Sequence, residues 1–146
     1  MDQNGILKNF YLFRGVTSED LYALNGIVEA KVYMGGDLVY SEGEVADALF
    51  LVEMGTVDIV PKGKEIVFAS IGSGQGFGEL AFFERGTRPA SASVRERTHL
   101  LRVPFEGLSK LLAERPKLAL LVYRNACAFF AKHFRMIASD LNRRYL

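Results

Sequence analysis

The spacing of hydrophobic residues changes twice along the chain and divides it into three parts. Up to residue 30, apolar side chains such as Ile6 and Phe10 recur every three or four positions, which is typical of short helices. From residue 31 to 104 the apolar runs are short and are separated by glycine or proline, which is typical of strands. Helical spacing returns from residue 105 to 146. The pattern predicts an α+β fold with helices on both sides of a β-rich centre.

Four runs in the central part are rich in valine, isoleucine, leucine and phenylalanine. We expect a strand at each of them: residues 49–52, 57–60, 66–69 and 100–103. Many short strands separated by regular turns favour an antiparallel β-roll of the jelly-roll type. A short helical run at residues 80–84 interrupts the strands.

Two helices are expected after Pro104, the first over residues 105–114 and a longer one from Pro116 to Leu146. The longer helix carries two apolar stripes, one of Leu118, Val122, Phe129 and Ile137 and another of Tyr123, Cys127, Phe130 and Phe134. A surface helix needs only one apolar stripe, so the second stripe indicates contact with a ligand or a partner subunit.

Length and composition fit one soluble domain, with 146 residues of which 49% are hydrophobic and 24% charged. A net charge of +1 provides no basic footprint for nucleic acid. Cys127 is the only cysteine, so an internal disulfide is excluded, and its alanine neighbours suggest a small buried side chain. No secretion signal or membrane span is recognisable. We therefore expect a single cytoplasmic domain without a membrane segment.

The sequence offers no set of residues for catalysis. His99 and His133 are far apart and no metal-ligand cluster is present, so neither a nucleophile with its base nor a metal site is recognisable. We therefore do not expect an enzyme, a metal or a cofactor.

A glycine-rich segment at residues 72–78 leads into the short helical run and carries four glycines in seven residues. Backbone N–H groups in such a segment can bind an anion. Glu79 follows directly and Arg88 comes nine residues later. A carboxylate accepts hydrogen bonds from sugar hydroxyls, and a guanidinium fits a phosphate, so the pair suits a nucleotide. The spacing alone fits a salt bridge equally well, and neither a P-loop nor a Rossmann pattern is present.

Residues 77–81 (Phe-Gly-Glu-Leu-Ala) and 88–91 (Arg-Pro-Ala-Ser) resemble the phosphate-binding cassette of the cyclic-nucleotide-binding domain family. That family includes bacterial catabolite activator protein, regulatory subunits of protein kinase A and cyclic-nucleotide-gated channels. Other segments from residue 12 to 57 are similar to family signatures in the same order, so the resemblance covers nearly the whole chain. It implies one domain: N-terminal helices over 1–30, a roll over 31–104 with the cassette at 72–91, and a hinge and lid over 105–146.

The resemblance also implies which residues bind the ligand. Glu79 would hold the ribose 2′-hydroxyl and Arg88 the cyclic phosphate. The full implied set is Gly78, Glu79, Leu80, Ala81, Arg88, Pro89, Ala90 and Ser91, with Ile59, Phe68 and His133 around the base. Pro89 departs from the family pattern, because that position commonly offers a backbone N–H to the phosphate and proline has none. Relatives selective for cGMP often have threonine there, so the expected ligand is cAMP rather than cGMP.

The function implied is that of a regulatory sensor whose C-terminal helix moves when the cyclic nucleotide binds. The chain to Leu146 holds no helix-turn-helix module for DNA, so we expect an unidentified protein effector and, through the long helix, a homodimer. The alternative is an interaction or dimerisation module of the same fold that has lost nucleotide binding. Pro89 favours this alternative, whereas retention of Glu79 and Arg88 argues against it, because an unpaired buried charge is costly.

Overall fold

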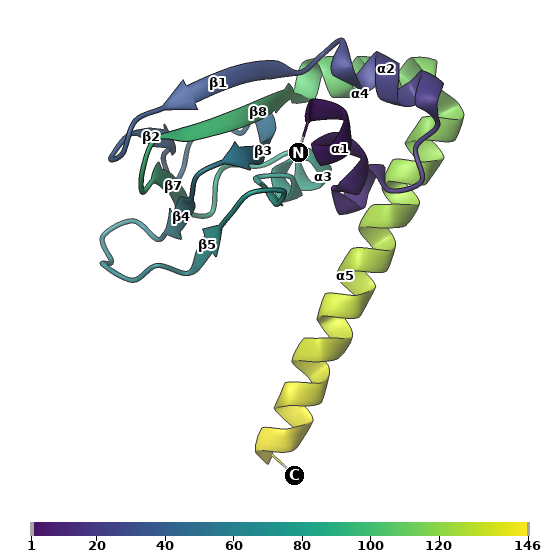
Figure 1. Ribbon diagram of the computed structural model, residues 1–146. Helices are drawn as coiled ribbons and strands as arrows, with labels where there is room; N and C mark the ends of the chain where they lie inside the picture. Colours follow the sequence, from purple (N-terminus) through teal and green to yellow (C-terminus); the bar gives the residue numbers. More distant parts are fainter. Residues whose placement is uncertain (1, 146) are drawn as a thin grey trace.

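The β-roll consists of two four-stranded sheets, seen in the computed structural model, which describes residues 2–145 (Figure 1). One sheet has the order β1 (Glu29–Tyr33), β8 (Thr98–Pro104), β3 (Ala48–Met54) and β6 (Gly76–Phe77). The other has the order β2 (Leu38–Tyr40), β7 (Ser91–Val94), β4 (Val57–Val60) and β5 (Ala69–Ile71). These strands pair antiparallel throughout. The predicted α+β fold with an antiparallel roll is confirmed.

Strand β3 shows why the roll has two cores. Five consecutive residues from Ala48 to Val52 are buried, because both faces of this strand are covered. Phe50 and Val52 point between the two sheets, whereas Leu49 and Leu51 point to the opposite face, into the core shared with the helices. Alternation along the strand thus divides its apolar side chains between a sheet–sheet core and a sheet–helix core.

The helices lie at one end of the roll. The N-terminal part has α1 (Gln3–Asn9), the 3₁₀ helix η1 (Tyr11–Phe13) and α2 (Ser18–Asn25), and the C-terminal part has α4 (Phe105–Glu114) and α5 (Pro116–Tyr145). A side-chain N-cap begins α1 at Asp2 and α2 at Thr17. The predicted helices after Pro104 begin where the sequence placed them. Within residues 2–145, no helix combines the length and hydrophobicity that crossing a membrane requires.

One strand expectation is wrong. Strand β5 begins at Ala69, and Ile66 and Phe68 are 61% and 66% exposed, although residues 66–69 were expected to pair. The N–H of Phe68 still bonds to Ile59 O at 2.8 Å, but Pro61 ends β4 and has no N–H to continue the ladder. Residues 66 and 67 have high β propensity but no partner strand to pair with, so they do not form a strand.

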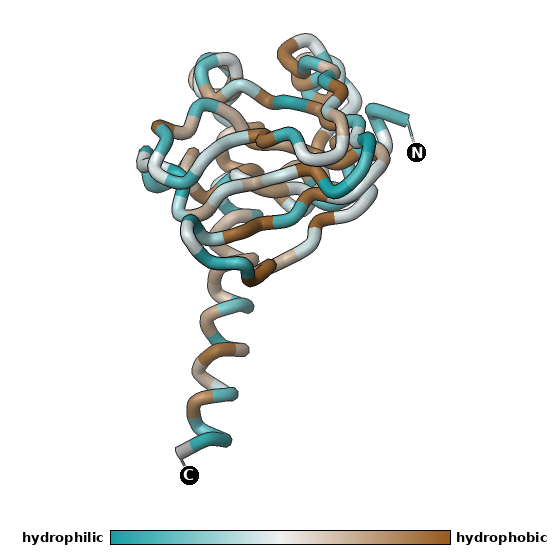
Figure 2. The backbone as a smooth tube through the Cα atoms, turned by 90° about the vertical axis from the view of Figure 1, so that its left-hand side faces the viewer, coloured by the Kyte–Doolittle hydropathy of each residue, from teal (hydrophilic) through white to brown (hydrophobic). Residues whose placement is uncertain are grey.

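Helix α5 leaves the body of the molecule and projects as an arm, along which hydrophobic positions recur (Figure 2). Its first stripe is buried only near the body, at Leu118 and Val122. Ile137, expected on this stripe, is 61% exposed because the helix has by then passed the edge of the body. The expectation of a buried Cys127 is also wrong, since this residue is exposed.

Candidate functional site

The glycine-rich segment turns sharply from strand β6 into the short helix α3 (Leu80–Glu84). Gly78 lies at this turn with φ of +81°, a left-handed conformation that residues with a side chain rarely adopt. A Cβ atom at Gly78 would lie 2.9 Å from Nη1 of Arg88. Glycine therefore allows both the turn and the close approach of the arginine to the backbone.

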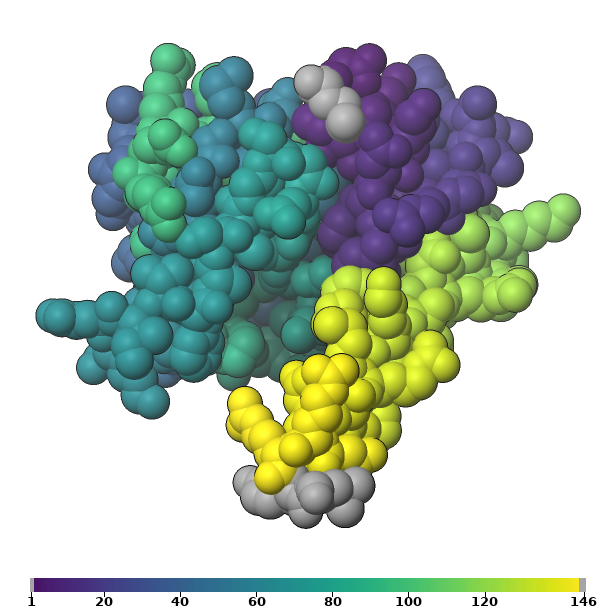
Figure 3. Space-filling model, turned by 60° about the horizontal axis from the view of Figure 1, so that its bottom comes forward, coloured from purple at the N-terminus to yellow at the C-terminus, as the bar shows by residue number. Residues whose placement is uncertain are grey.

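A hollow of about 480 Å³ lies between the roll and helix α5, and Figure 3 shows the molecule hollowed between these parts. Strands of both sheets, helix α3 and two side chains of α5 contribute to it. Its lining residues are Tyr40, Ile59, Ala69, Ile71, Gly76, Phe77, Gly78, Glu79, Leu80, Ala81, Arg88, Pro89, Phe129 and His133. Residues that are up to 93 positions apart thus meet around one hollow of the size that small molecules occupy.

Arg88 is a buried cation at this hollow, with only 3% of its surface exposed. Its Nη1 donates to Gly78 O at 3.0 Å and its Nη2 to Ala48 O at 2.5 Å, while the guanidinium lies 4.0 Å from the centre of the Tyr40 ring. Burial lowers the pKa of Arg88 from its usual value, but arginine stays protonated at neutral pH. None of the ion pairs within residues 2–145 involves Arg88, so its charge is open to an anion.

Glu79 is the buried carboxylate of the same hollow and is 9% exposed. Its Oε2 accepts a hydrogen bond of 2.9 Å from the Tyr11 hydroxyl. Burial raises the pKa of Glu79, and hydrogen bonds from Tyr11 and from its own N–H oppose that rise. The salt bridge with Arg88 that the spacing also allowed is not formed between these two described side chains, so both remain available to a ligand.

The rest of the lining is mainly apolar and suits a flat ring. Ile59, Ala69 and Ile71 of the roll contribute to it, as do Phe129 and His133 of α5. Nδ1 of His133 lies 2.9 Å from Phe129 O. A carbonyl oxygen only accepts hydrogen bonds, so Nδ1 is the donor in this contact.

The family model of the cyclic nucleotide-binding domain matches residues 30–115. The chain belongs to the cyclic-nucleotide-binding domain family. The resemblance of the cassette and the predicted fold are thereby confirmed, and the chain is a regulatory domain of this family.

Three relatives illustrate the match. The chain is 30% identical over 139 residues to the cyclic AMP receptor protein of Thermus thermophilus, covering 93% of this chain and 62% of that protein. It is 29% identical over 117 residues to a CRP-like cAMP-activated global transcriptional regulator of Mycobacterium tuberculosis, covering 78% and 52%. The N-terminal domain of a transcriptional regulator from Streptomyces coelicolor superposes with a TM-score of 0.80 at 26% identity, covering 90% and 94%. The chain spans less than two thirds of the two full-length relatives.

The cyclic-nucleotide-binding domain brings together eight of the eleven residues that the resemblance implied. Phe68 lies outside the hollow with 66% of its surface exposed, and its place beside the expected base is taken by Ala69 and Ile71. Ala90 is buried but does not line the hollow, and Ser91 Oγ accepts a hydrogen bond of 2.9 Å from the N–H of Glu42. These two cassette residues contribute to the wall rather than to the surface of the site.

Sequence reasoning missed three aromatic residues of the domain's site. Tyr40 lies under Arg88, Tyr11 donates to Glu79, and Phe129 lines the hollow. The apolar pattern of α5 singled out Phe129 only as a helix-face residue. For Tyr11 and Tyr40 the sequence holds no signal, because both reach the cassette from distant segments.

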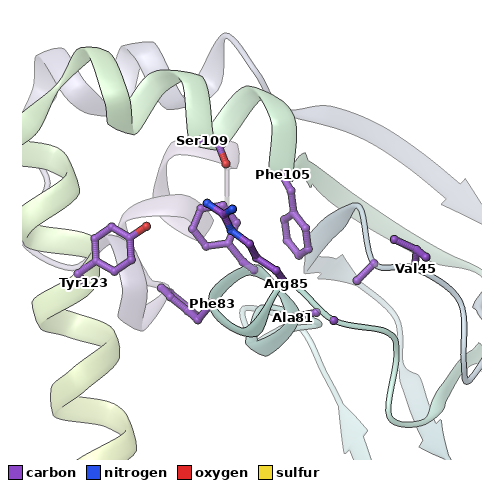
Figure 4. Close-up of a pocket in the computed structure, with 10 residues that line it drawn as sticks. Val45, Ala81, Phe83, Arg85, Phe105, Ser109 and Tyr123 are labelled. Carbon is purple, nitrogen blue, oxygen red and sulfur yellow. The ribbon is translucent and has the colours of Figure 1, made fainter.

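A second hollow of about 410 Å³ lies on the other side of helix α3 (Figure 4). It is bounded by α3, α4 and α5 and contains neither Glu79 nor Arg88. Ala81 lines both hollows, so α3 is the wall between them. Phe82 packs edge-on against Phe105 of α4, with ring centroids 5.2 Å apart, and Phe83 packs edge-on against Tyr123 of α5 at 5.7 Å. Helix α3 thus contacts both C-terminal helices.

Proposed function

We propose that this domain binds cAMP and acts as a sensor that passes the binding event to helix α5. The observation that carries the proposal is the buried Arg88 guanidinium beside the buried Glu79 carboxylate: Arg88 has two carbonyl partners and, among residues 2–145, no carboxylate in an ion pair with it. A cyclic phosphate supplies the missing negative charge and a ribose hydroxyl supplies a donor for the carboxylate. The relative from Thermus thermophilus, described as a cyclic AMP receptor protein, supports the same ligand class.

His133 favours cAMP over cGMP in this proposal. With Nδ1 donating to Phe129 O, Nε2 would accept a hydrogen bond when the ring carries a single proton. Adenine offers an exocyclic amino group as a donor, whereas guanine has an acceptor oxygen at the corresponding position. The absence of a hydroxyl at Pro89 agrees with this preference, because no side-chain donor or acceptor for guanine is present there.

The proposed movement begins at helix α3. Leu80 and Ala81 of its first turn line the hollow together with Arg88, so we expect their backbone N–H groups to donate to a bound phosphate and draw α3 toward Arg88. Phe83 then shifts against Tyr123 and Phe130 of α5, to which it packs at 5.7 and 5.9 Å. The second hollow behind α3 leaves room for this repacking. The ligand shifts α5 only as far as its affinities for the two positions differ.

Thermal unfolding with added nucleotide tests the proposal. We expect cAMP at a hundredfold its Kd to stabilise the protein by about 2.7 kcal/mol, cGMP to stabilise it less, and 5′-AMP, which lacks the cyclic diester, to have little effect. Arg88→Ala should lower the cAMP affinity at least tenfold, because hydrogen bonds to a charged group contribute about 1.5–3 kcal/mol. Arg95→Ala is the matched control, since Arg95 is exposed and paired with Asp58 away from the hollow.

The competing function is an interaction module that keeps the roll without the ligand. Pro89 is the observation that favours it, because it lines the hollow and has no N–H for a phosphate. An unchanged melting temperature with each of the three nucleotides would overturn the sensor proposal and favour this module. A Pro89→Ala variant that then gains cAMP binding would identify the proline as the cause.

A further inference from the structure

Tyr11 is the one side chain of η1 that contacts both the buried carboxylate and helix α5. Its hydroxyl donates to Glu79 Oε2 at 2.9 Å. Its ring stacks on Phe129 of α5, with centroids 3.9 Å apart and an angle of 14° between the planes. A single residue of the N-terminal segment therefore touches two parts of the molecule on which the proposed function depends.

The hydroxyl of Tyr11 stays a donor under all ordinary conditions. Burial, followed by the negative charge of Glu79, raises the pKa of Tyr11 far above its usual value. Tyr11 does not line the 480 Å³ hollow but lies behind Glu79, where it borders a smaller neighbouring hollow. The carboxylate is thus held from behind by Tyr11 while it faces the ligand space.

A side chain of helix α5 also bonds to the backbone of η1 and of the residue after it. Nδ2 of Asn125 donates to Leu12 O at 2.9 Å and to Arg14 O at 3.0 Å. These two bonds fix η1 against the first half of α5, one turn before Phe129. Because the backbone around Tyr11 is fixed in this way, a rotation of the Tyr11 ring changes its contact with Phe129.

We propose that Tyr11 is a positioning residue that couples the occupancy of the Glu79 carboxylate to the position of helix α5. This inference rests on the proposed cAMP binding. A ribose hydroxyl that donates to Glu79 adds a second donor to the carboxylate and weakens the Tyr11 hydrogen bond. The phenol, held less tightly by the carboxylate, changes its stacking on Phe129, and Phe129 carries the change into α5. This route is separate from the contact of Phe83 with α5, because it starts at the ribose and not at the phosphate.

The variant Tyr11→Phe removes only the hydroxyl and keeps the ring that stacks on Phe129. Calorimetry measures the Kd for cAMP. A fluorophore attached to the cysteine of Lys132→Cys reports the position of α5. The native cysteine is removed by Cys127→Ser so that only position 132 is labelled, and both positions are exposed on α5. Tyr22→Phe is the matched control, because Tyr22 is 83% exposed on α2. In the reporter background we expect saturating cAMP to change the fluorescence. Tyr11→Phe should lose at least half of this amplitude while its Kd stays within tenfold.

Phe129→Leu provides a second variant that keeps the Tyr11 hydroxyl but removes the stack. It should lose the same amplitude at saturating cAMP, whatever its Kd. Full amplitude in Tyr11→Phe, or a reporter that stays silent while calorimetry shows binding to the parent protein, would overturn the coupling and leave the proposed function intact. Absence of cAMP binding to the parent protein would overturn the proposed function itself, and the inference with it.

Discussion

Two buried charges of opposite sign line one hollow without neutralising each other. Arg88 bonds to two backbone carbonyls and Glu79 to a phenol, although both side chains are more than nine-tenths buried. Removing a charged group from water is costly unless partners replace the lost hydration. The site therefore carries an energetic cost that a ligand with a phosphate and a hydroxyl can relieve.

Glu79→Gln tests this cost in the protein without nucleotide. Because burial raises the pKa of Glu79, the folded state binds a proton more readily than the unfolded state, and the free energy of unfolding falls as pH rises through this range. The loss of stability from the buried charge of Glu79 is absent below the ordinary glutamate pKa of about 4.3 and is complete above the raised pKa. The amide that Glu79→Gln introduces stays neutral and can still accept from Tyr11, so this variant should melt about 2–5 °C higher than the parent at pH 8.

Circular dichroism melts between pH 4 and pH 8 measure this effect. The difference in melting temperature between Glu79→Gln and the parent should shrink as the pH falls. Glu65→Gln is the control, because Glu65 is an exposed carboxylate outside the site. A difference that stays constant or grows on acidification would show that the charge of Glu79 is not the source of the cost.

At the scale of elements, the junction of η1 with α5 depends on one amide side chain. Asn125→Ala leaves Leu12 O and Arg14 O without the donor that now reaches both. We expect the free energy of unfolding to fall by about 1–3 kcal/mol, because the partly buried Leu12 O is left unsatisfied, whereas water can replace the donor at the exposed Arg14 O. Urea unfolding measures the loss, and Asn142→Ala is the matched control, since Asn142 is exposed on the arm of the same helix. Equal stability of the two variants would contradict this role of Asn125.

The elements of the fold were predictable wherever a local pattern is decisive. The apolar runs at β3, β4 and β8 and the proline at the start of α5 predicted those elements. The strand at residues 66–69 failed because pairing depends on the partner, and Pro61 ends that partner. Glu79 and Arg88 were identifiable from the cassette, whereas Tyr11 and Tyr40 were not, because their contacts with the site are tertiary. Residues of a local motif can thus be predicted from the sequence, whereas residues that contact the site from distant segments cannot.

At the scale of the whole molecule, the projecting half of α5 is mostly exposed to solvent along residues 131–144. Apolar residues on it alternate three and four positions apart, the spacing of a coiled-coil seam. This seam consists of Leu120, Tyr123, Cys127, Phe130, Phe134, Ile137 and Leu141. Its first part also packs within the chain, because Tyr123 and Phe130 contact Phe83. Ile137 was expected on the stripe of Leu118 and Val122, but its spacing from Phe134 and Leu141 places it on this seam. Ile137 and Phe134 are 61% and 72% exposed, and a helix that stands alone in water is only marginally stable. The homodimer expected from the sequence would cover this seam.

We expect light scattering at micromolar concentration to give twice the chain mass of 16.3 kDa. Ile137→Asp should give the mass of one chain, because a carboxylate in the seam would be buried against a second apolar helix. Ala131→Asp is the control, since residue 131 is exposed on α5 but outside the seam. Two copies paired in parallel also bring their Cys127 side chains together, so mild oxidation should produce a disulfide-linked dimer in the parent and not in Ile137→Asp. A single-chain mass for the parent would contradict the homodimer.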